Sequence, residues 1–336
     1  MIAAGIIANP ASGKDIRRLA AHGSVFDNHE KVSIVRRVLL GLEAMRVERV
    51  WIMPDSFGIG HKALDRLRLG LDVSFLKMPV TFTQDDSTTA AALMAEAGVG
   101  CIVTLGGDGT NRAMAKAGGD VPLMPISTGT NNVFPTMIEG TIAGLAAGLV
   151  ACGLVDEAVR TMPRLDVIRP GSPVDMALVD VAVYDERFVA ARAIWDASKI
   201  KEVVLIRAEP GSIGLSSIGA HLPAMTPKAG QGLYFRMGAY GQQVLAPIAP
   251  GLIQLVSLAE SRLLEPGDEV VISHPQPCVL ALDGEREIEL RAEAPVCIRL
   301  NANGPRVVDA RRAVEVGAAA GVFVQEVSIT PPARRR

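Results

Sequence analysis

The chain has 336 residues, of which 49% are hydrophobic and 21% charged, which is enough for two domains with substantial cores. Its formal net charge of −2 gives no electrostatic support for binding nucleic acid or an anionic membrane, and the short run Arg334-Arg335-Arg336 does not alter that balance. The longest uncharged run, Thr141 to Val155, is shorter than the roughly 20 apolar residues that span a bilayer.

The chain opens with a predicted strand, Ala4 to Ala8, that runs into the polar turn Asn9-Pro10-Ala11-Ser12-Gly13-Lys14. An amide, a hydroxyl and a lysine in a glycine-containing turn are compatible with a phosphate. The turn is not a Walker A loop, because Asp15 stands where Ser or Thr should follow the lysine. The candidate phosphate-binding residues here are Asn9, Ser12, Gly13 and Lys14.

Helices and strands then alternate along the first half of the chain. The patterns predict helices over Glu30–Met45, Ile59–Leu69 and Thr88–Ala97, the last capped by Asp86 or Ser87, with strands over Val47–Met53 and Val73–Met78. This alternation predicts a doubly wound parallel sheet with helices on both faces.

The segment Gly106-Gly107-Asp108-Gly109-Thr110 lies between a predicted buried strand, Cys101–Leu105, and a predicted helix that ends at Gly118-Gly119. Glycines at such a junction let backbone N–H groups approach a phosphate, and the helix N-terminus adds partial positive charge. A carboxylate there needs its own task, either accepting a proton from an attacking hydroxyl or holding Mg²⁺. The alternative is that Asp108 only caps the helix.

A third turn follows the apolar segment Val121–Met124 and carries hydroxyls and amides without charge: Thr128, Gly129, Thr130, Asn131 and Asn132. Such groups suit contacts to a phosphate, a ribose or a substrate hydroxyl. All three turns follow likely strands, so we expect them to meet in one crevice at the carboxyl edge of the sheet.

From Asp166 onward the pattern is mostly of short strands separated by turns, which predicts an all-β second domain. The predicted strands are Met176–Tyr184, Val203–Ala208, Gly232–Met237, Leu252–Leu258, Glu269–Ser273, Cys278–Leu282, Glu287–Arg291 and Val296–Leu300. Helical character returns over Asp309–Val316. We predict an α/β nucleotide-binding domain over 1–160, a β-rich substrate domain over 161–305, and a segment over 306–336 that packs back on the first domain.

Asp283-Gly284 between two strand-like runs is the strongest local signal for a tight hairpin, which by itself accounts for Leu282-Asp283-Gly284-Glu285. Four scattered cysteines are typical of reduced core residues: Cys101, Cys152, Cys278 and Cys297. The five histidines lack metal-ligand spacing, and Met1 leads straight into a strand without a signal peptide. These features predict a cytoplasmic protein.

Together the three turns resemble the superfamily that joins NAD kinases to diacylglycerol and sphingosine kinases. Asn-Pro-x-Ser-Gly-Lys is similar to the lipid kinases, Gly-Gly-Asp-Gly-Thr is common to both branches, and Asn132 matches the last residue of the lipid kinases' Gly-Thr-Gly-Asn. The longer motifs Gly-Gly-Asp-Gly-Thr-Asn-Arg and Ser-Thr-Gly-Thr-Asn-Asn look most like those of the AcoX proteins, NAD-kinase-like members associated with acetoin catabolism. The resemblance is strong over residues 1–135 and looser beyond.

In the second domain the resemblance has gaps. NAD kinases carry an Asn-Glu pair where this chain has Val179-Asp180, and a Gly-Ser-Thr-Ala-Tyr run where it has Gly211 to Leu215, so Asp180 and Ser212 remain as candidate acceptor contacts. Lipid kinases carry Asp-Gly-Glu at Asp283 to Glu285, with acidic groups linked to magnesium and base chemistry. Phosphoryl transfer is therefore better supported than NAD as the acceptor.

The resemblance implies an ATP-dependent kinase that uses Mg²⁺ and phosphorylates a hydroxyl of a small nucleotide-like substrate, with NAD as the first candidate acceptor and NADP as its product. Asp108 would be the catalytic residue, the first-domain turns would bind the ATP phosphates, and Asn131, Asn132, Asp180 and Ser212 would face the acceptor. The alternatives are a diacylglycerol-type lipid kinase and a catalytically weak nucleotide-binding regulator. Polyphosphate remains open as the donor, and exposed strand edges are compatible with a homo-oligomer.

Overall fold

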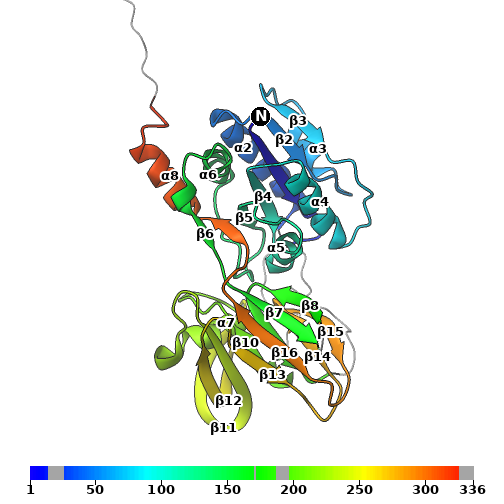
Figure 1. Cartoon of the computed structure of the whole chain (residues 1–336), viewed down its shortest axis with the longest axis vertical. Helices are drawn as coiled ribbons and strands as arrows, with labels where there is room; N and C mark the ends of the chain where they lie inside the picture. Colours follow the sequence, from blue (N-terminus) through cyan, green and yellow to red (C-terminus); the bar gives the residue numbers. More distant parts are fainter. Residues whose placement is uncertain (14–25, 170–171, 187–196, 325–336) are drawn as a thin grey trace, which may run out of the picture.

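A computed structural model describes residues 1–13, 26–169, 172–186 and 197–324. The chain forms an α/β domain followed by a domain rich in antiparallel strands (Figure 1). The chain passes into the second domain after strand β6 and returns through strand β17, so the two linking segments lie next to each other. The fold predicted from the sequence is confirmed.

The first domain is built on a seven-stranded sheet of order β3-β2-β1-β4-β5-β17-β6. Its strands β1 to β5 are mutually parallel, β17 is parallel to β5, and β6 is antiparallel to β17. The bounds are β1 Ala3–Ala8, β2 Arg49–Ile52, β3 Asp72–Phe75, β4 Cys101–Gly106, β5 Leu123–Ser127, β6 Val159–Thr161 and β17 Arg306–Val308.

Helices cover both faces of this sheet. Side chains alternate along β1, so Ile6 contacts the core under α2, α3, α6 and α8, whereas Ile7 contacts the core under α4 and α5. The bounds are α2 Asn28–Ala44, α3 Ile59–Leu64, α4 Asp85–Glu96, α5 Asp108–Ala115, α6 Gly140–Ala151 and α8 Ala310–Ala319. Burial on both faces explains why β1 and β4 are apolar without interruption.

The second domain contains two antiparallel sheets. One has six strands in the order β12-β11-β10-β9-β14-β15, and the other has four in the order β13-β16-β7-β8. The bounds are β7 Arg164–Arg169, β8 Ser172–Ala177, β9 Asp180–Tyr184, β10 Ile200–Leu205, β11 Gly232–Ala249, β12 Leu252–Leu264, β13 Glu269–Ile272, β14 Cys278–Leu282, β15 Glu285–Leu290 and β16 Val296–Asn301, with helix α7 over Leu215–Ala220. Side chains from both sheets form one of its cores.

The structure corrects two predicted elements. The single strand predicted over Met176–Tyr184 is two strands, β8 and β9, in different sheets, because the backbone N–H groups of Leu178 and Val179 turn away to donate to Asp283. Helix α4 begins at Asp85 and is not capped by Asp86, whose carboxylate instead accepts hydrogen bonds from the backbone of the preceding loop. The short helix α7 was not predicted.

Candidate functional site

The three polar turns meet at the carboxyl edge of β1, β4 and β5. Asn9 Nδ2 donates to Thr110 Oγ1 over 2.9 Å, which joins the first turn to the start of α5. The hydroxyls of Ser12 and Thr128 are 2.9 Å apart, which joins the first turn to the third. The expected convergence is therefore present in the fold. Lys14 lies outside the described residues.

Lys31, on α2, donates hydrogen bonds to the backbone of the first turn. This residue was not singled out from the sequence. Its buried ammonium donates to the carbonyl oxygens of Asn9 at 2.8 Å and Ser12 at 2.7 Å, and to Asn28 Oδ1 at 3.0 Å. An ammonium with carbonyl partners fixes the backbone of the turn. The sequence offered no signal for this role, because a lysine on an amphipathic helix is usually solvated.

Close approach of the Asn132 side chain explains Gly107. A Cβ at this position would lie 2.7 Å from Asn132 Oδ1, closer than side-chain atoms normally come. Asn132 is itself held by Nδ2, which donates to Ser127 Oγ over 2.8 Å. Gly106, Gly107 and Gly109 thus lie at the junction of β4 and α5, and Gly129 contacts Asn132 from the third turn. Thr130 is exposed.

Asp108 is the first residue of α5 and is 8% exposed. Its carboxylate accepts hydrogen bonds from the backbone N–H of Val133 at 3.0 Å and of Phe134 at 2.7 Å. The helix is capped by Gly107, so Asp108 does not serve as the N-cap. The carboxylate instead connects the β4–α5 junction to the segment after the third turn.

Asp283 and Glu285 reach the same region from the second domain. Asp283 and Gly284 form the two-residue turn between β14 and β15, with φ of 53° and 76°, as the Asp-Gly signal predicts. Glu285 extends to the start of α5, where a Cβ on Gly109 would lie 3.4 Å from both of its carboxylate oxygens. The acidic hairpin therefore faces the first-domain turns (Figure 1).

Asp283 has structural partners. Its Oδ1 accepts from the backbone N–H of Leu178 at 2.9 Å and of Val179 at 2.8 Å, and its Oδ2 lies 3.4 Å from Arg112 Nε. Burial raises the pKa of Asp283, while Arg112 and the backbone donors oppose that shift. Arg112, one helical turn after Asp108, also contacts Glu287 and Asp175. The Asp283 carboxylate therefore stabilises the contact between the two domains.

The remaining predicted residues lie at different distances from this centre. Asp180 begins β9, is 5% exposed, and accepts the Asp283 N–H with its backbone oxygen at 2.9 Å. Asn131 lies in the third turn. Ser212 lies in the turn before α7, where its N–H donates to Glu209 O. The structure therefore places Asp180 beside the interdomain hairpin, and Ser212 farther along the second domain.

Magnesium is the metal ion that the sequence resemblance implies, so the acidic side chains near the glycine turns are its candidate ligands. Mg²⁺ usually keeps several waters and is bound by one or two carboxylates together with substrate phosphates. Within the described ranges no group of three or more His, Cys, Asp or Glu side chains could hold a metal ion. Asp283 is occupied by Arg112 and backbone donors, so Glu285, at the start of α5, is the acid of this hairpin that lies closest to the glycine turns.

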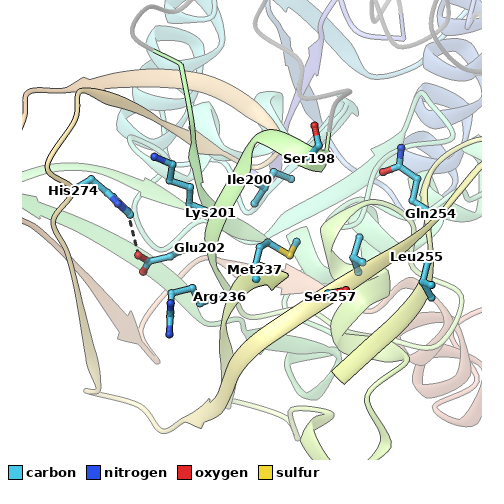
Figure 2. A pocket seen from close by; sticks show the side chains of 12 residues that line it. Ser198, Ile200, Lys201, Glu202, Arg236, Met237, Gln254, Leu255, Ser257 and His274 are labelled. Atoms are coloured by element: carbon cyan, nitrogen blue, oxygen red, sulfur yellow. Dashed lines mark ion pairs between the residues drawn. The ribbon is translucent and has the colours of Figure 1, made fainter. Parts of the chain in front are cut away.

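A separate cavity of about 770 Å³ lies in the second domain, between β10, β11 and β12 (Figure 2). Each of its basic side chains has a carboxylate partner: His274 with Glu202 at 3.1 Å, Lys201 with Asp185 at 3.0 Å, and Arg236 with Glu260 at 3.4 Å. None of the predicted site residues lines it. Because each of these basic side chains already has a carboxylate partner, the interdomain region around Asp108 is the stronger candidate site.

Comparison with known proteins agrees with this geometry. Residues 4–154 match the ATP-NAD kinase N-terminal domain, and residues 163–303 match the acetoin catabolism protein X C-terminal domain. The acetoin catabolism protein X of Cupriavidus necator is 41% identical over 321 residues, which cover 91% of this chain and 89% of that protein. The chain belongs to the acetoin catabolism protein X family.

Solved structures place this family member in a wider fold group. Yeast NADH kinase complexed with NADH has a TM-score of 0.54 at 13% identity, covering 98% of this chain and 90% of that chain. A putative diacylglycerol kinase from Bacillus anthracis str. Sterne has a TM-score of 0.51 at 15% identity, covering 91% and 97%. The family therefore has the fold of both NAD kinase-like and diacylglycerol kinase-like proteins. Among the described helices, none has the length and apolarity to cross a membrane.

Proposed function

We propose that this protein is an ATP-dependent kinase that transfers a phosphoryl group to a hydroxyl of a small nucleotide-like acceptor, with NAD as the first candidate. The observation that carries the proposal is the position of Asp108. Its carboxylate is fixed at the start of α5, next to the glycine turns, by the backbone N–H groups of Val133 and Phe134. Membership of a kinase-like family supports phosphoryl transfer as the reaction class.

In the proposed mechanism the turns around Ser12, Gly107 and Thr128 hold the triphosphate through backbone N–H groups and hydroxyls. Asp108 orients the acceptor hydroxyl for in-line attack and accepts its proton. The acceptor oxygen bonds to the γ-phosphorus while the bond from that phosphorus to the bridging oxygen breaks and ADP leaves. Mg²⁺ bound with ATP would neutralise charge on the phosphates. Catalysis in such a site comes mainly from positioning and charge stabilisation.

The test is turnover of purified protein with Mg-ATP and NAD, with NADP detected by an NADP-specific dehydrogenase. Asp108→Asn should fold normally and lose at least about 100-fold in turnover, since positioned acid–base groups contribute roughly 10²–10⁴-fold. Asp120→Asn is the matched control, because Asp120 is exposed just beyond the opposite end of α5. Full activity of Asp108→Asn would remove Asp108 from the mechanism.

The same assay separates the alternatives. Polyphosphate replaces ATP in a parallel reaction, and detergent-presented diacylglycerol replaces NAD. Phosphorylation of diacylglycerol alone would identify a lipid kinase. Saturable binding of ATP or NAD without transfer to any acceptor would identify a nucleotide-binding regulator.

A further inference from the structure

Arg207 is a buried arginine between the two domains that the mechanism above does not use. It follows β10, and its side chain is 9% exposed. Its Nε donates to the backbone oxygen of Leu178 over 3.2 Å, within the second domain. Its guanidinium also lies over the ring of Phe134, 4.6 Å from the ring centroid, and Phe134 belongs to the first domain. The side chain is therefore anchored from both sides of the interdomain region.

Phe134 connects this arginine to Asp108. The backbone N–H of Phe134 donates to Asp108 Oδ1 at 2.7 Å, while the ring of the same residue supports the Arg207 guanidinium. Burial lowers the pKa of Arg207, and the carboxylates of Glu209, Asp108 and Asp283 oppose that shift. A guanidinium stays charged under ordinary conditions, so Phe134 contacts both a fixed positive charge and the candidate catalytic carboxylate.

Among the described residues, the terminal nitrogens of Arg207 make no hydrogen bond. Nη1 lies 3.8 Å from Glu209 Oε1, beyond hydrogen-bond distance, and the Glu209 side chain is 75% exposed. Within the part of the chain that the structure describes, the Nε bond to Leu178 is the single hydrogen bond of this guanidinium. A charged side chain that is mostly buried is normally paired with an opposite charge or with hydrogen-bond acceptors. The planar set of N–H donors on a guanidinium fits the oxygens of a carboxylate or a phosphate.

We propose that Arg207 determines acceptor specificity by binding an anionic group, a phosphate or a carboxylate, of the substrate whose hydroxyl lies at Asp108. This inference rests on the proposed function. Arg207 reaches the site from the second domain, across from the first-domain turns assigned to ATP, so it is placed to meet the acceptor. A neutral diacylglycerol offers no anion to the terminal N–H groups, whereas the diphosphate of a dinucleotide would accept charge-assisted hydrogen bonds from them.

The first experiment compares charged and neutral acceptors in pairs: NAD with nicotinamide riboside, glycerol 3-phosphate with glycerol, and dioctanoylglycerol in detergent. Transfer from γ-labelled ATP is measured for the wild type, Arg207→Gln, Arg207→Lys and Arg262→Gln. Arg262 is the matched control, because it lies over the Tyr234 ring but is exposed on the second domain. Thermal unfolding checks that each variant is folded.

The expected result is transfer to a charged acceptor, with Arg207→Gln raising its KM about 10- to 100-fold, as expected for a lost charged hydrogen bond. The KM for ATP should change less than threefold. Arg207→Lys should fall between the wild type and Arg207→Gln, since it keeps the charge but not the fork. A merely structural role would shift the KM values of ATP and acceptor together.

A binding experiment separates this inference from the kinase proposal. Calorimetric titration with NAD and with inorganic pyrophosphate needs no turnover. Binding that weakens at least tenfold in Arg207→Gln, without transfer to any acceptor, would retain the anion site and reject the kinase function. The inference is overturned if dioctanoylglycerol is the acceptor, if Arg207→Gln weakens ATP instead, or if no charged compound depends on Arg207.

Discussion

The guanidinium of Arg112, on α5 of the first domain, lies 3.4 Å from the carboxylate of Asp283, in the hairpin turn of the second domain. The two side chains are 1% and 0% exposed. Burial alone would lower the pKa of Arg112, but Asp283, Glu287 and Asp175 together raise it. Arg112, one helical turn after Asp108, therefore joins the two domains through a cluster of charges with Asp283, Glu287 and Asp175.

Arg112→Met should destabilise the protein strongly. The substitution leaves the Asp283 carboxylate buried without its counter-charge, which typically costs about 3 to 5 kcal/mol. Urea unfolding followed by circular dichroism measures the loss. Arg299→Met is the control, because Arg299 pairs with Glu269 at the surface, where both side chains are more than 40% exposed, and a surface pair is worth about 1 kcal/mol at most. Equal losses in the two variants would contradict the assigned role of the cluster.

Lys31→Met should weaken both the fold and the first turn. The backbone oxygens of Asn9 and Ser12 would lose their ammonium partner, although Asn9 O would keep its bond from the Ser12 hydroxyl, and each lost hydrogen bond to a charged group is worth about 1.5 to 3 kcal/mol. We expect a loss of about 2 to 4 kcal/mol in unfolding free energy and weaker ATP binding by calorimetry. The exposed Lys77→Met serves as the control. Unchanged stability would show that the turn does not need this support.

Gly144→Val should disrupt the contact between α2 and α6. A Cβ on Gly144 would lie 2.9 Å from the Cα of Val38, so the two helices approach backbone to backbone. Overpacking of this kind costs about 1 to 3 kcal/mol, because backbone cannot move as a flexible side chain does. Thermal unfolding tests this loss. Ile142→Ala, a partly exposed position on the same helix, should change the midpoint little.

Tyr234 predicts a pH dependence at the alkaline end. Burial and the nearby Glu202 carboxylate, which accepts the Tyr234 hydroxyl at 3.0 Å, raise the pKa of Tyr234 above its ordinary value of 10.0. Above pH 10 the unfolded chain therefore releases this proton before the folded protein does, and stability falls as pH rises. Urea unfolding from pH 8 to 11 should show the wild type losing its advantage over Tyr234→Phe. A constant difference across that range would refute the shift.

Several elements could be predicted because their signals are local. Apolar runs predicted β1 and β4, and Asp283-Gly284 predicted the β14–β15 hairpin that the structure confirms. Single strands and helix starts were less well predicted. Leu178 and Val179 lie in an apolar run that looks continuous, yet Asp283, more than 100 positions away, takes their backbone N–H groups and breaks the strand.

The candidate site divides in the same way. The glycine turns and Asp108 were selected from the sequence, because glycine at a strand end lets the backbone approach a ligand closely. Lys31 and Arg207 were not, because nothing near them in the sequence distinguishes them from ordinary helical and loop residues. Their contacts come from other elements: the first turn for Lys31, and Leu178 and Phe134 for Arg207.

The sequence by itself determined the α/β alternation, the β-rich second half and the kinase-like turns, since these depend on periodicity and on residues adjacent along the chain. Only the tertiary structure decided which charges meet between the domains. Arg112 and Glu287 are 175 positions apart and contact each other at 2.8 Å because the packing of the two domains brings α5 and β15 together. Such a contact depends on the packing of whole domains, and no local pattern records it.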